Sequence, residues 1–202
     1  MWKYSRFVRV LVAVVPLSLL STVTFGASVS VKAPMVCSRG PSDTSYTAVL
    51  TLPASAPTGS IFTVRVDSLS SGIISHTGLN YIFDMTTDYP VPSGTTYVEG
   101  SARVVPETGT PNVRDGARAW QDAAGIHLAL PAHVPNGSSY TPPSLEFAVK
   151  ITAAAGSNVA IKFSHYEVTA NAIIVGDVHT VCDPNPKPYA LAVMHVDPAV
   201  AP

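Results

Sequence analysis

Residues 145–152 read Leu-Glu-Phe-Ala-Val-Lys-Ile-Thr, in which large apolar side chains alternate with polar or small ones. Successive side chains of a β-strand point to opposite faces of a sheet, so Leu145, Phe147, Val149 and Ile151 share one face. The residues between them share the other face. This pattern predicts a strand with one buried and one solvated face, which is typical of antiparallel sheets.

The same period of two recurs along the chain. Proline- and glycine-rich breakers separate the alternating segments at short intervals, as at residues 57–59, 106–111 and 184–188. No long window keeps a helical period. We therefore predict an all-β protein, an antiparallel Ig-like β-sandwich of roughly ten short strands. Besides 145–152, the predicted strands are residues 46–52, 62–66, 80–85, 96–104, 126–130, 159–163, 172–175, 178–182 and 190–196.

The N-terminus has the parts of an export signal. Lys3, Arg6 and Arg9 form a basic region, residues 10–20 are apolar, and small residues around Gly26 suit a signal peptidase. The apolar run is rather short for a helix that crosses a bilayer. An uncleaved anchor is the alternative to a cleaved signal.

This leader sets the expected organisation of the chain. We predict a signal peptide at residues 1–26, one β-sandwich domain at residues 27–197 and a flexible tail at residues 198–202. The exported part, roughly 175 residues, has the size of one domain. The protein is expected to be secreted, either extracellular or at the cell envelope, with no integral membrane segment after cleavage.

Cys37 and Cys182 are the only two cysteines, and they bracket almost the whole exported domain. A lone pair in an exported chain favours a disulfide bond. Closing a loop of about 144 residues is expected to stabilise the fold by about 4–5 kcal/mol. Two free buried thiols are the alternative. The spacing of histidines around these cysteines does not match a zinc motif, so we expect neither a metal site nor a cofactor.

The charge balance excludes some classes of partner. Without Lys3, Arg6 and Arg9, the chain keeps nine basic and thirteen acidic residues, a formal net charge of −4. No run of basic residues remains. A nucleic-acid partner would need such a basic patch, so we expect none.

Two short motifs carry a resemblance. The leader, an early cysteine and the late stretch Val181-Cys182-Asp183-Pro184, followed by Leu191-Ala192-Val193 and Val196, resemble the layout of secreted actinobacterial Ig-like β-sandwich proteins. Tyr97, Gly100 and Ser101 lie in a segment, 94–103, that resembles strands of bacterial adhesins and surface repeats. The resemblance implies an envelope or extracellular location, and it brings no catalytic residues with it.

The chemistry-bearing residues show no arrangement of a known hydrolase. The sequence has no G-x-S-x-G elbow, no H-E-x-x-H motif and no Walker-type loop. Six histidines are scattered, and His127 and His179 fall on the predicted solvent faces of strands. A glycosidase would need two facing carboxylates. Glu99, Glu146 and Asp177 are the candidates for such a role, but solvated strand faces explain them better, and we expect no catalysis.

The long segment 106–122 contains a candidate aromatic binding residue. Residues 106–122 are weakly patterned, and long loops in compact domains are often functional. Trp120 lies in this segment and is either a core residue or a platform for a sugar or another partner. The predicted binding residues are Trp120, Arg114, Arg118, Tyr97 and Tyr140.

These observations favour a secreted, non-catalytic binding or structural module, whose partner is a glycan or protein of the cell envelope. A carrier of a lipid or another small hydrophobic ligand is the first alternative. It would need a cavity between the sheets, with which small side chains such as Ala148 and Ala160 are compatible. A carbohydrate-active enzyme is the second alternative.

Overall fold

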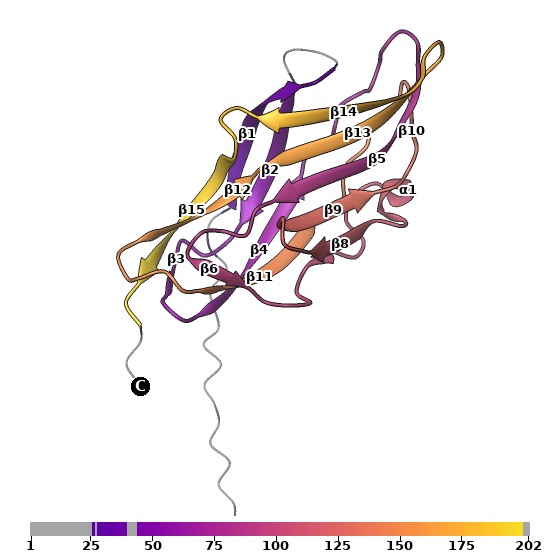
Figure 1. Ribbon diagram of the computed structural model, residues 1–202. Coiled ribbons are helices and arrows are strands. Elements are labelled where there is room, and N and C mark those ends of the chain that lie inside the picture. The colour runs from indigo at the N-terminus through magenta and orange to yellow at the C-terminus, as the bar shows by residue number, and fades with distance from the viewer. Residues whose placement is uncertain (1–25, 27, 40–43, 200–202) are drawn as a thin grey trace, which may run out of the picture.

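The computed structural model describes residue 26, residues 28–39 and residues 44–199, which form fifteen strands and one short helix (Figure 1). The predicted leader, apart from residue 26, and the last three residues of the predicted tail lie outside the described residues. Within the described residues, no helix is long and apolar enough to span a membrane. The elements are β1 (Ser28–Cys37), β2 (Ser45–Thr51), β3 (Ser55–Pro57), β4 (Ile61–Ser68), β5 (Leu79–Tyr89), β6 (Thr95–Tyr97), β7 (Arg103–Val104), α1 (Pro111–Arg114), β8 (Arg118–Gln121), β9 (Ile126–Leu130), β10 (Val134–Pro135), β11 (Leu145–Ile151), β12 (Asn158–Phe163), β13 (His165–Ala172), β14 (Gly176–Pro184) and β15 (Tyr189–Asp197).

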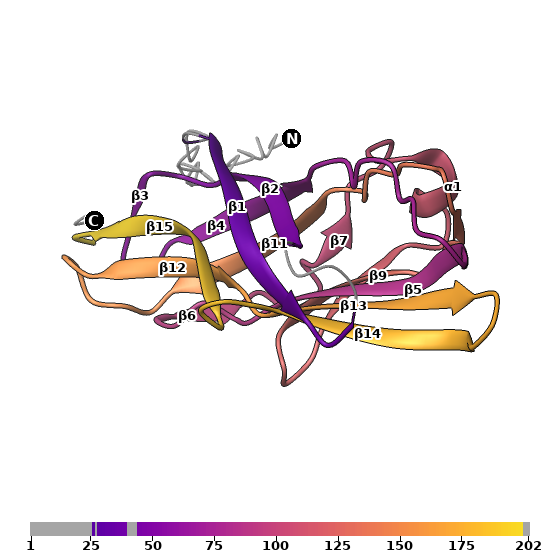
Figure 2. The ribbon, with the colours of Figure 1, turned by 90° about the horizontal axis from the view of Figure 1, so that it is seen from above.

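The strands form two facing layers and a small third sheet (Figure 2). One layer runs β6-β11-β4-β2-β1, and the other runs β1-β14-β13-β5-β9-β8. Neighbouring strands are antiparallel in both layers, and β7 and β10 pair with β11 and β5. The third sheet has the order β12-β15-β3, in which β15 and β3 are parallel. The predicted antiparallel Ig-like β-sandwich is confirmed.

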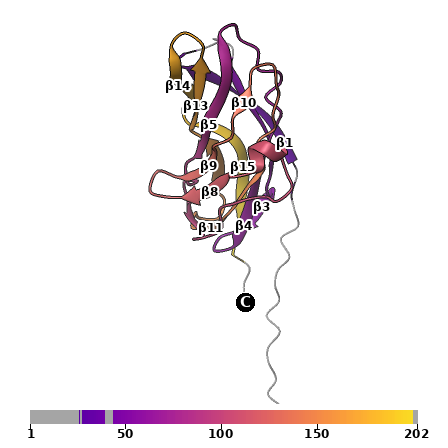
Figure 3. The ribbon, with the colours of Figure 1, turned by 90° about the vertical axis from the view of Figure 1, so that its right-hand side faces the viewer.

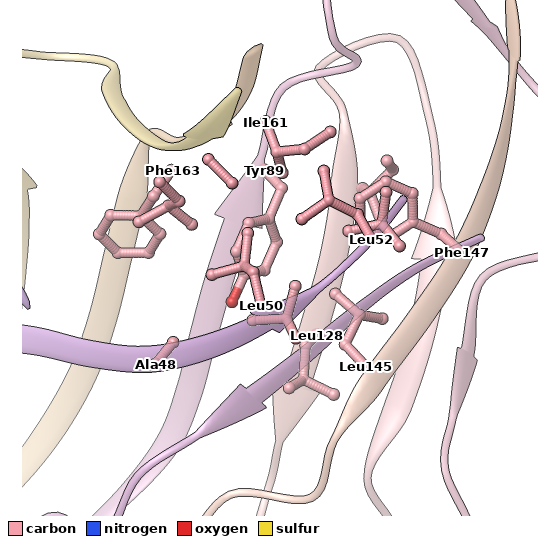
Figure 4. Close-up of a cluster of buried hydrophobic side chains, with 14 of the residues drawn as sticks. Ala48, Leu50, Leu52, Tyr89, Leu128, Leu145, Phe147, Ile161 and Phe163 are labelled. Carbon is pink, nitrogen blue, oxygen red and sulfur yellow. The ribbon is translucent and has the colours of Figure 1, made fainter. Parts of the chain in front are cut away.

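The core follows from the alternation of the strands. In β11, Leu145, Phe147, Val149 and Ile151 are all buried, while the residues between them are partly or fully exposed. Side chains from both layers and from the third sheet pack together in one core between the sheets. Figure 4 shows one cluster of this core, which includes Ala48, Leu50, Leu52, Tyr89, Leu128, Leu145, Phe147, Ile161 and Phe163.

The strand β1 belongs to both layers. Its residues 28–34 pair with β2, whereas residues 35–37 pair with β14. This second pairing places Cys37 directly opposite Cys182, and their sulfur atoms form a disulfide bond of 2.02 Å. The predicted disulfide is therefore confirmed, and it joins the N-terminal strand to the second layer.

Two predicted strands are wrong in extent. Residues 173–175 form the turn between β13 and β14 rather than a strand, and the strand lies before them, at His165–Ala172. The apolar run Ile-Ile-Val suggested a strand, but Gly176 follows it at φ +74°, a backbone conformation that closes a three-residue hairpin loop. The predicted strand at 96–104 is divided into β6 and β7, because a turn with Gly100 at φ +72° interrupts it.

The segment 106–122 is more ordered than its sequence pattern indicated. It contains α1 and the edge strand β8, which pairs with β9. The N–H groups of Val113 and Arg114 both donate to the carbonyl oxygen of Thr110 at the start of the helix. The end of the segment, β8, is therefore part of the second layer, and the rest is a connection that contains α1.

We expect that replacing both cysteines (Cys37→Ala with Cys182→Ala) lowers the free energy of unfolding by about 4–5 kcal/mol. The reason is that the bond closes a loop between residues 145 positions apart and so restricts the unfolded chain. Urea unfolding followed by circular dichroism measures the loss. A reducing agent should destabilise the wild-type protein by a similar amount and leave the double variant unchanged. Equal urea midpoints for the two proteins would contradict the prediction.

Candidate binding sites

A cleft of about 630 Å³ lies between the two layers. Alternate residues of β13, namely Tyr166, Val168, Ala170 and Ala172, line one wall. All residues of β13 are only partly buried, because the facing layer does not cover the strand completely. The other walls come from the start of β2, the connection 68–78 and residues 140–142.

Small residues leave this space open. Ala170, Ala172 and Gly78 line the cleft, so nothing larger fills the gap between the sheets there. Ala148 and Ala160, which the sequence suggested as compatible with a cavity, are not among its lining residues. The disulfide cysteines are among them, so the covalent link forms part of the wall.

Hydroxyl groups, among them those of Tyr46, Ser68, Tyr140 and Tyr166, supply many of the polar groups of the cleft lining. The Tyr46 hydroxyl lies 2.6 Å from that of Tyr89 and 2.9 Å from Ser68 Oγ. The hydroxyls of Tyr140 and Tyr166 lie 3.3 Å apart. Burial raises the pKa of Tyr46 and Tyr140, so both remain neutral at physiological pH. Among the described residues that line the cleft, Arg39 alone carries a formal charge.

A second hollow, of about 790 Å³, lies near the opposite end of β5. Trp120 and Tyr97, two of the predicted binding residues, line it together with Glu99. The side chain of Trp120 is 40% exposed, and one face of its ring stacks on His127 at a centroid distance of 5.0 Å. The Tyr97 hydroxyl accepts a hydrogen bond from the Ala102 N–H. The hollow therefore has an exposed aromatic surface, and His127 holds the Trp120 ring in position from the opposite side of the ring.

His127 lies on the face of β9 that points away from the core, but it is not exposed to solvent as the prediction expected. The Trp120 ring covers it, and the residue is only 6% exposed. Its Nδ1 lies 2.7 Å from an Asp88 oxygen, and its Nε2 lies 2.9 Å from an Asp122 oxygen. Burial lowers the pKa of His127, but the two carboxylates outweigh it, so the net pKa lies above its ordinary value of 6.5.

A second histidine is held in the same way. His165 Nε2 lies 2.6 Å from Glu167, and Nδ1 lies 2.7 Å from Asp183. Burial lowers the pKa of His165, and its two carboxylate partners raise it above 6.5 overall. Lys187 also donates to Asp183. Sequence reasoning missed this group because its members are distributed over β13, β14 and the connection after β14. His179 is exposed, as predicted.

The other predicted binding residues do not gather at the Trp120 hollow. Tyr140 lines the inter-sheet cleft instead. Arg114 belongs to α1 and lies 3.9 Å from Asp115, while Arg118 is exposed on β8. None of these three lines the hollow.

The three carboxylates considered for catalysis, Glu99, Glu146 and Asp177, contact different residues. Glu146 forms an ion pair with Arg103 at 2.5 Å and another with Arg65 at 3.6 Å. Asp177 accepts a hydrogen bond from the Asn171 side chain beside the β13–β14 turn. Glu99 lines the Trp120 hollow. None of these contacts joins one of the three carboxylates to another.

No protein-family model matches this chain, and no curated protein matches it. Among solved structures, it is similar to a protein of Corynebacterium diphtheriae described as membrane anchored (12% identity, TM-score 0.41), covering 86% of this chain but only 38% of that one. It is also similar to the sixth cohesin of Acetivibrio cellulolyticus scaffoldin B (18%, TM-score 0.35), covering 72% of this chain and 94% of the cohesin. A non-cellulosomal cohesin from Archaeoglobus fulgidus gives 11% identity and a TM-score of 0.32, covering 75% and 82%. At these low scores and identities, none of the three is a basis for assigning a function to this chain.

The contacts of His127 and His165 with carboxylates predict how the stability of the fold depends on pH. The pKa of His127 and of His165 is higher in the folded protein than the unfolded value of about 6.5, so their contribution is complete below about pH 6.5. It is lost as the pH rises through the folded pKa. Burial raises the pKa of Asp183, but its contacts with Lys187 and His165 lower it overall. Asp183 therefore stabilises the fold at pH values above 3.8, its ordinary pKa. We expect the melting temperature to fall as the pH rises from 6 to 9, measured by differential scanning calorimetry.

The matched control removes the two titrating groups. A double variant, His127→Gln with His165→Gln, should show a smaller change in melting temperature over the same pH range. An equal change in wild type and variant would show that other groups cause the pH dependence.

Proposed function

We propose that this chain is a secreted, non-catalytic binding domain of the cell envelope or extracellular space, which holds a small hydrophobic ligand such as a lipid chain. The observation that carries the proposal is the apolar cleft between the two layers. Its volume, about 630 Å³, falls in the range of pockets that enclose small molecules. The extracellular location is supported by the leader pattern and by the disulfide.

The lining of the cleft suits an apolar ligand. Aliphatic side chains such as Ile82 and Val168 face it, and they gain free energy when a ligand replaces the water against them. The buried tyrosine hydroxyls can donate hydrogen bonds to a polar end group of the ligand, such as a carbonyl or ester oxygen. Because burial raises the pKa of these hydroxyls, they remain neutral and serve to orient a ligand rather than to transfer protons.

The disulfide supports this function mechanically. It links β1 covalently to β14 at one side of the cleft, which restricts the movement of this wall. A pre-formed wall lowers the entropy that binding costs. A carrier needs such a cavity to stay open in the absence of its ligand.

We expect the purified protein to bind the fluorescent fatty acid 11-dansylaminoundecanoic acid saturably, and oleic acid to displace it. The variant Ala170→Phe places a large side chain in the cleft and should weaken binding by about tenfold or more, about 1.4 kcal/mol. Fluorescence titration measures both affinities.

The matched control is Thr169→Phe, which adds the same side chain on the other face of β13, outside the cleft lining. It should retain the wild-type affinity. Circular dichroism checks that both variants are folded. No saturable binding by the wild-type protein, or equal affinities of wild type and Ala170→Phe, would exclude a hydrophobic ligand in this cleft.

The Trp120 hollow favours a second candidate function, the binding of an envelope glycan. A half-exposed indole whose position is fixed by His127 can stack against a sugar ring, and Glu99 can accept hydrogen bonds from sugar hydroxyls. This site does not share residues with the inter-sheet cleft. The two functions can therefore be tested separately.

We expect a glycan array to identify an oligosaccharide ligand, and Trp120→Ala to weaken its binding by about tenfold, since a stacking platform is lost. Isothermal titration calorimetry measures the affinity. The control Tyr81→Ala removes another aromatic ring, which stacks on His133 outside the hollow, and should bind normally. If no glycan binds, or if Trp120→Ala binds as wild type does, Trp120 is not a sugar platform.

A further inference from the structure

The turn between β13 and β14 exposes three consecutive large aliphatic side chains. Ile173, Ile174 and Val175 are 67%, 93% and 70% exposed. Ile73, in the connection that leads to β5, is 73% exposed. Contiguous exposed apolar side chains of this kind mark a site of interaction with a membrane or another protein. We call Ile73 and residues 173–175 the apolar tip.

The two segments of the apolar tip lie at the same end of the molecule. The Ile173 N–H donates to the Gly78 carbonyl oxygen at 2.8 Å, which ties the hairpin turn to the connection before β5. The Ile74 carbonyl accepts from the Gly137 N–H at 2.7 Å, which holds the same connection from its other side. Figure 1 and Figure 3 both show the β13–β14 hairpin and the connection into β5 projecting beyond the rest of the sandwich.

We propose that the apolar tip inserts into the surface of a lipid bilayer and docks the domain there. The inference goes beyond the proposed function, since the tip exposes its side chains whether or not the cleft holds a ligand. The occupant is a bilayer rather than a protein partner for two reasons, shape and charge.

The shape of the tip favours a bilayer. It is a projection of four side chains, whereas a standard protein interface uses about 20–30 residues on each side. A projecting turn can enter a fluid surface that closes around it, and its aliphatic side chains then leave water for the region where headgroups meet acyl chains. The fold holds the turn by its backbone hydrogen bonds, so insertion needs no conformational change.

The charges around the tip favour a bilayer as well. Residues 69–80 contain no aspartate, glutamate, lysine or arginine, and residues 169–180 contain only Asp177, which accepts a hydrogen bond from Asn171. Each segment also contains one histidine, His76 in the first and His179 in the second. Little charge must therefore be desolvated when the tip enters the interface. Since no lysine or arginine lies in these segments, attraction to anionic lipids contributes little, and we expect binding that depends weakly on lipid charge.

The tip also lies beside one end of the cleft. Ala172, which precedes Ile173, and Gly78, whose carbonyl accepts the Ile173 N–H, both line the cleft. Insertion of the tip would bring this end of the cleft to the lipid surface. A lipid chain could then pass between membrane and cleft without crossing bulk water.

Vesicle flotation tests the proposal. The wild-type protein without the predicted leader, residues 1–26, should float with phosphatidylcholine vesicles, to a similar extent when phosphatidylglycerol is added and when the salt concentration is raised. The variant Ile174→Asp should lower the partition coefficient by about tenfold or more, because the most exposed side chain no longer favours the interface. The matched control is Val193→Asp on β15, since Val193 is 59% exposed but lies away from the tip.

A second variant reports insertion directly. In the protein without the predicted leader, residues 1–26, Ile174→Trp places an indole at the tip, and its fluorescence should shift to shorter wavelength when phosphatidylcholine vesicles are added. The same protein without this substitution has Trp120 as its single tryptophan and gives the reference spectrum. A wild-type protein that does not float, an Ile174→Asp variant that floats as wild type does, or binding that disappears in high salt would overturn the proposal.

Binding of 11-dansylaminoundecanoic acid separates this inference from the proposed function. Ile174→Asp should keep the wild-type affinity for the probe, and Ala170→Phe should still float with vesicles. If the probe does not bind but the tip inserts, only the cleft proposal fails. If the probe binds and no variant alters flotation, only the inference about the tip fails.

Discussion

The structure depends on one strand that two sheets share. β1 pairs with β2 through its first seven residues and with β14 through its last three, and the Cys37–Cys182 bond makes the second pairing covalent. Sheets twist, so two layers that are joined along one strand separate as they extend from it. Large side chains such as Phe62 and Phe147 occupy the space over most of the molecule, and small ones on β13 leave it open at the cleft.

This arrangement gives the two ends of the second layer different surfaces. Near the start of β5, the cleft and the apolar tip lie together, with almost no charge around them. Near its end, Trp120 stacks on a histidine that two carboxylates hold. His127 and His165 each lie between two carboxylates, which raise their pKa values although burial alone would lower them.

Much of the fold could be predicted from local patterns, and the sites could be predicted only in part. The alternation in residues 145–151 and 126–130 placed those strands correctly because one face of each meets the core. The turn at 173–175 was mistaken for a strand, since three aliphatic residues at an exposed tip have no local explanation. Trp120 and Tyr97 do share a hollow, whereas Tyr140 lies in the cleft, because strand pairing between distant segments decides which loops meet.

The sequence by itself determined the β class of this protein and its closure by a single pair of cysteines. Both follow from side-chain period and residue counts, which are local or compositional properties. Only the tertiary structure decided that β1 crosses between the sheets, that Trp120 covers His127, and that an apolar cleft opens beside an apolar tip. Each of these depends on which strands become neighbours and on how far one sheet extends past the other. Alternation along one chain leaves both undetermined, since it tells which face of a strand is buried but not what buries it.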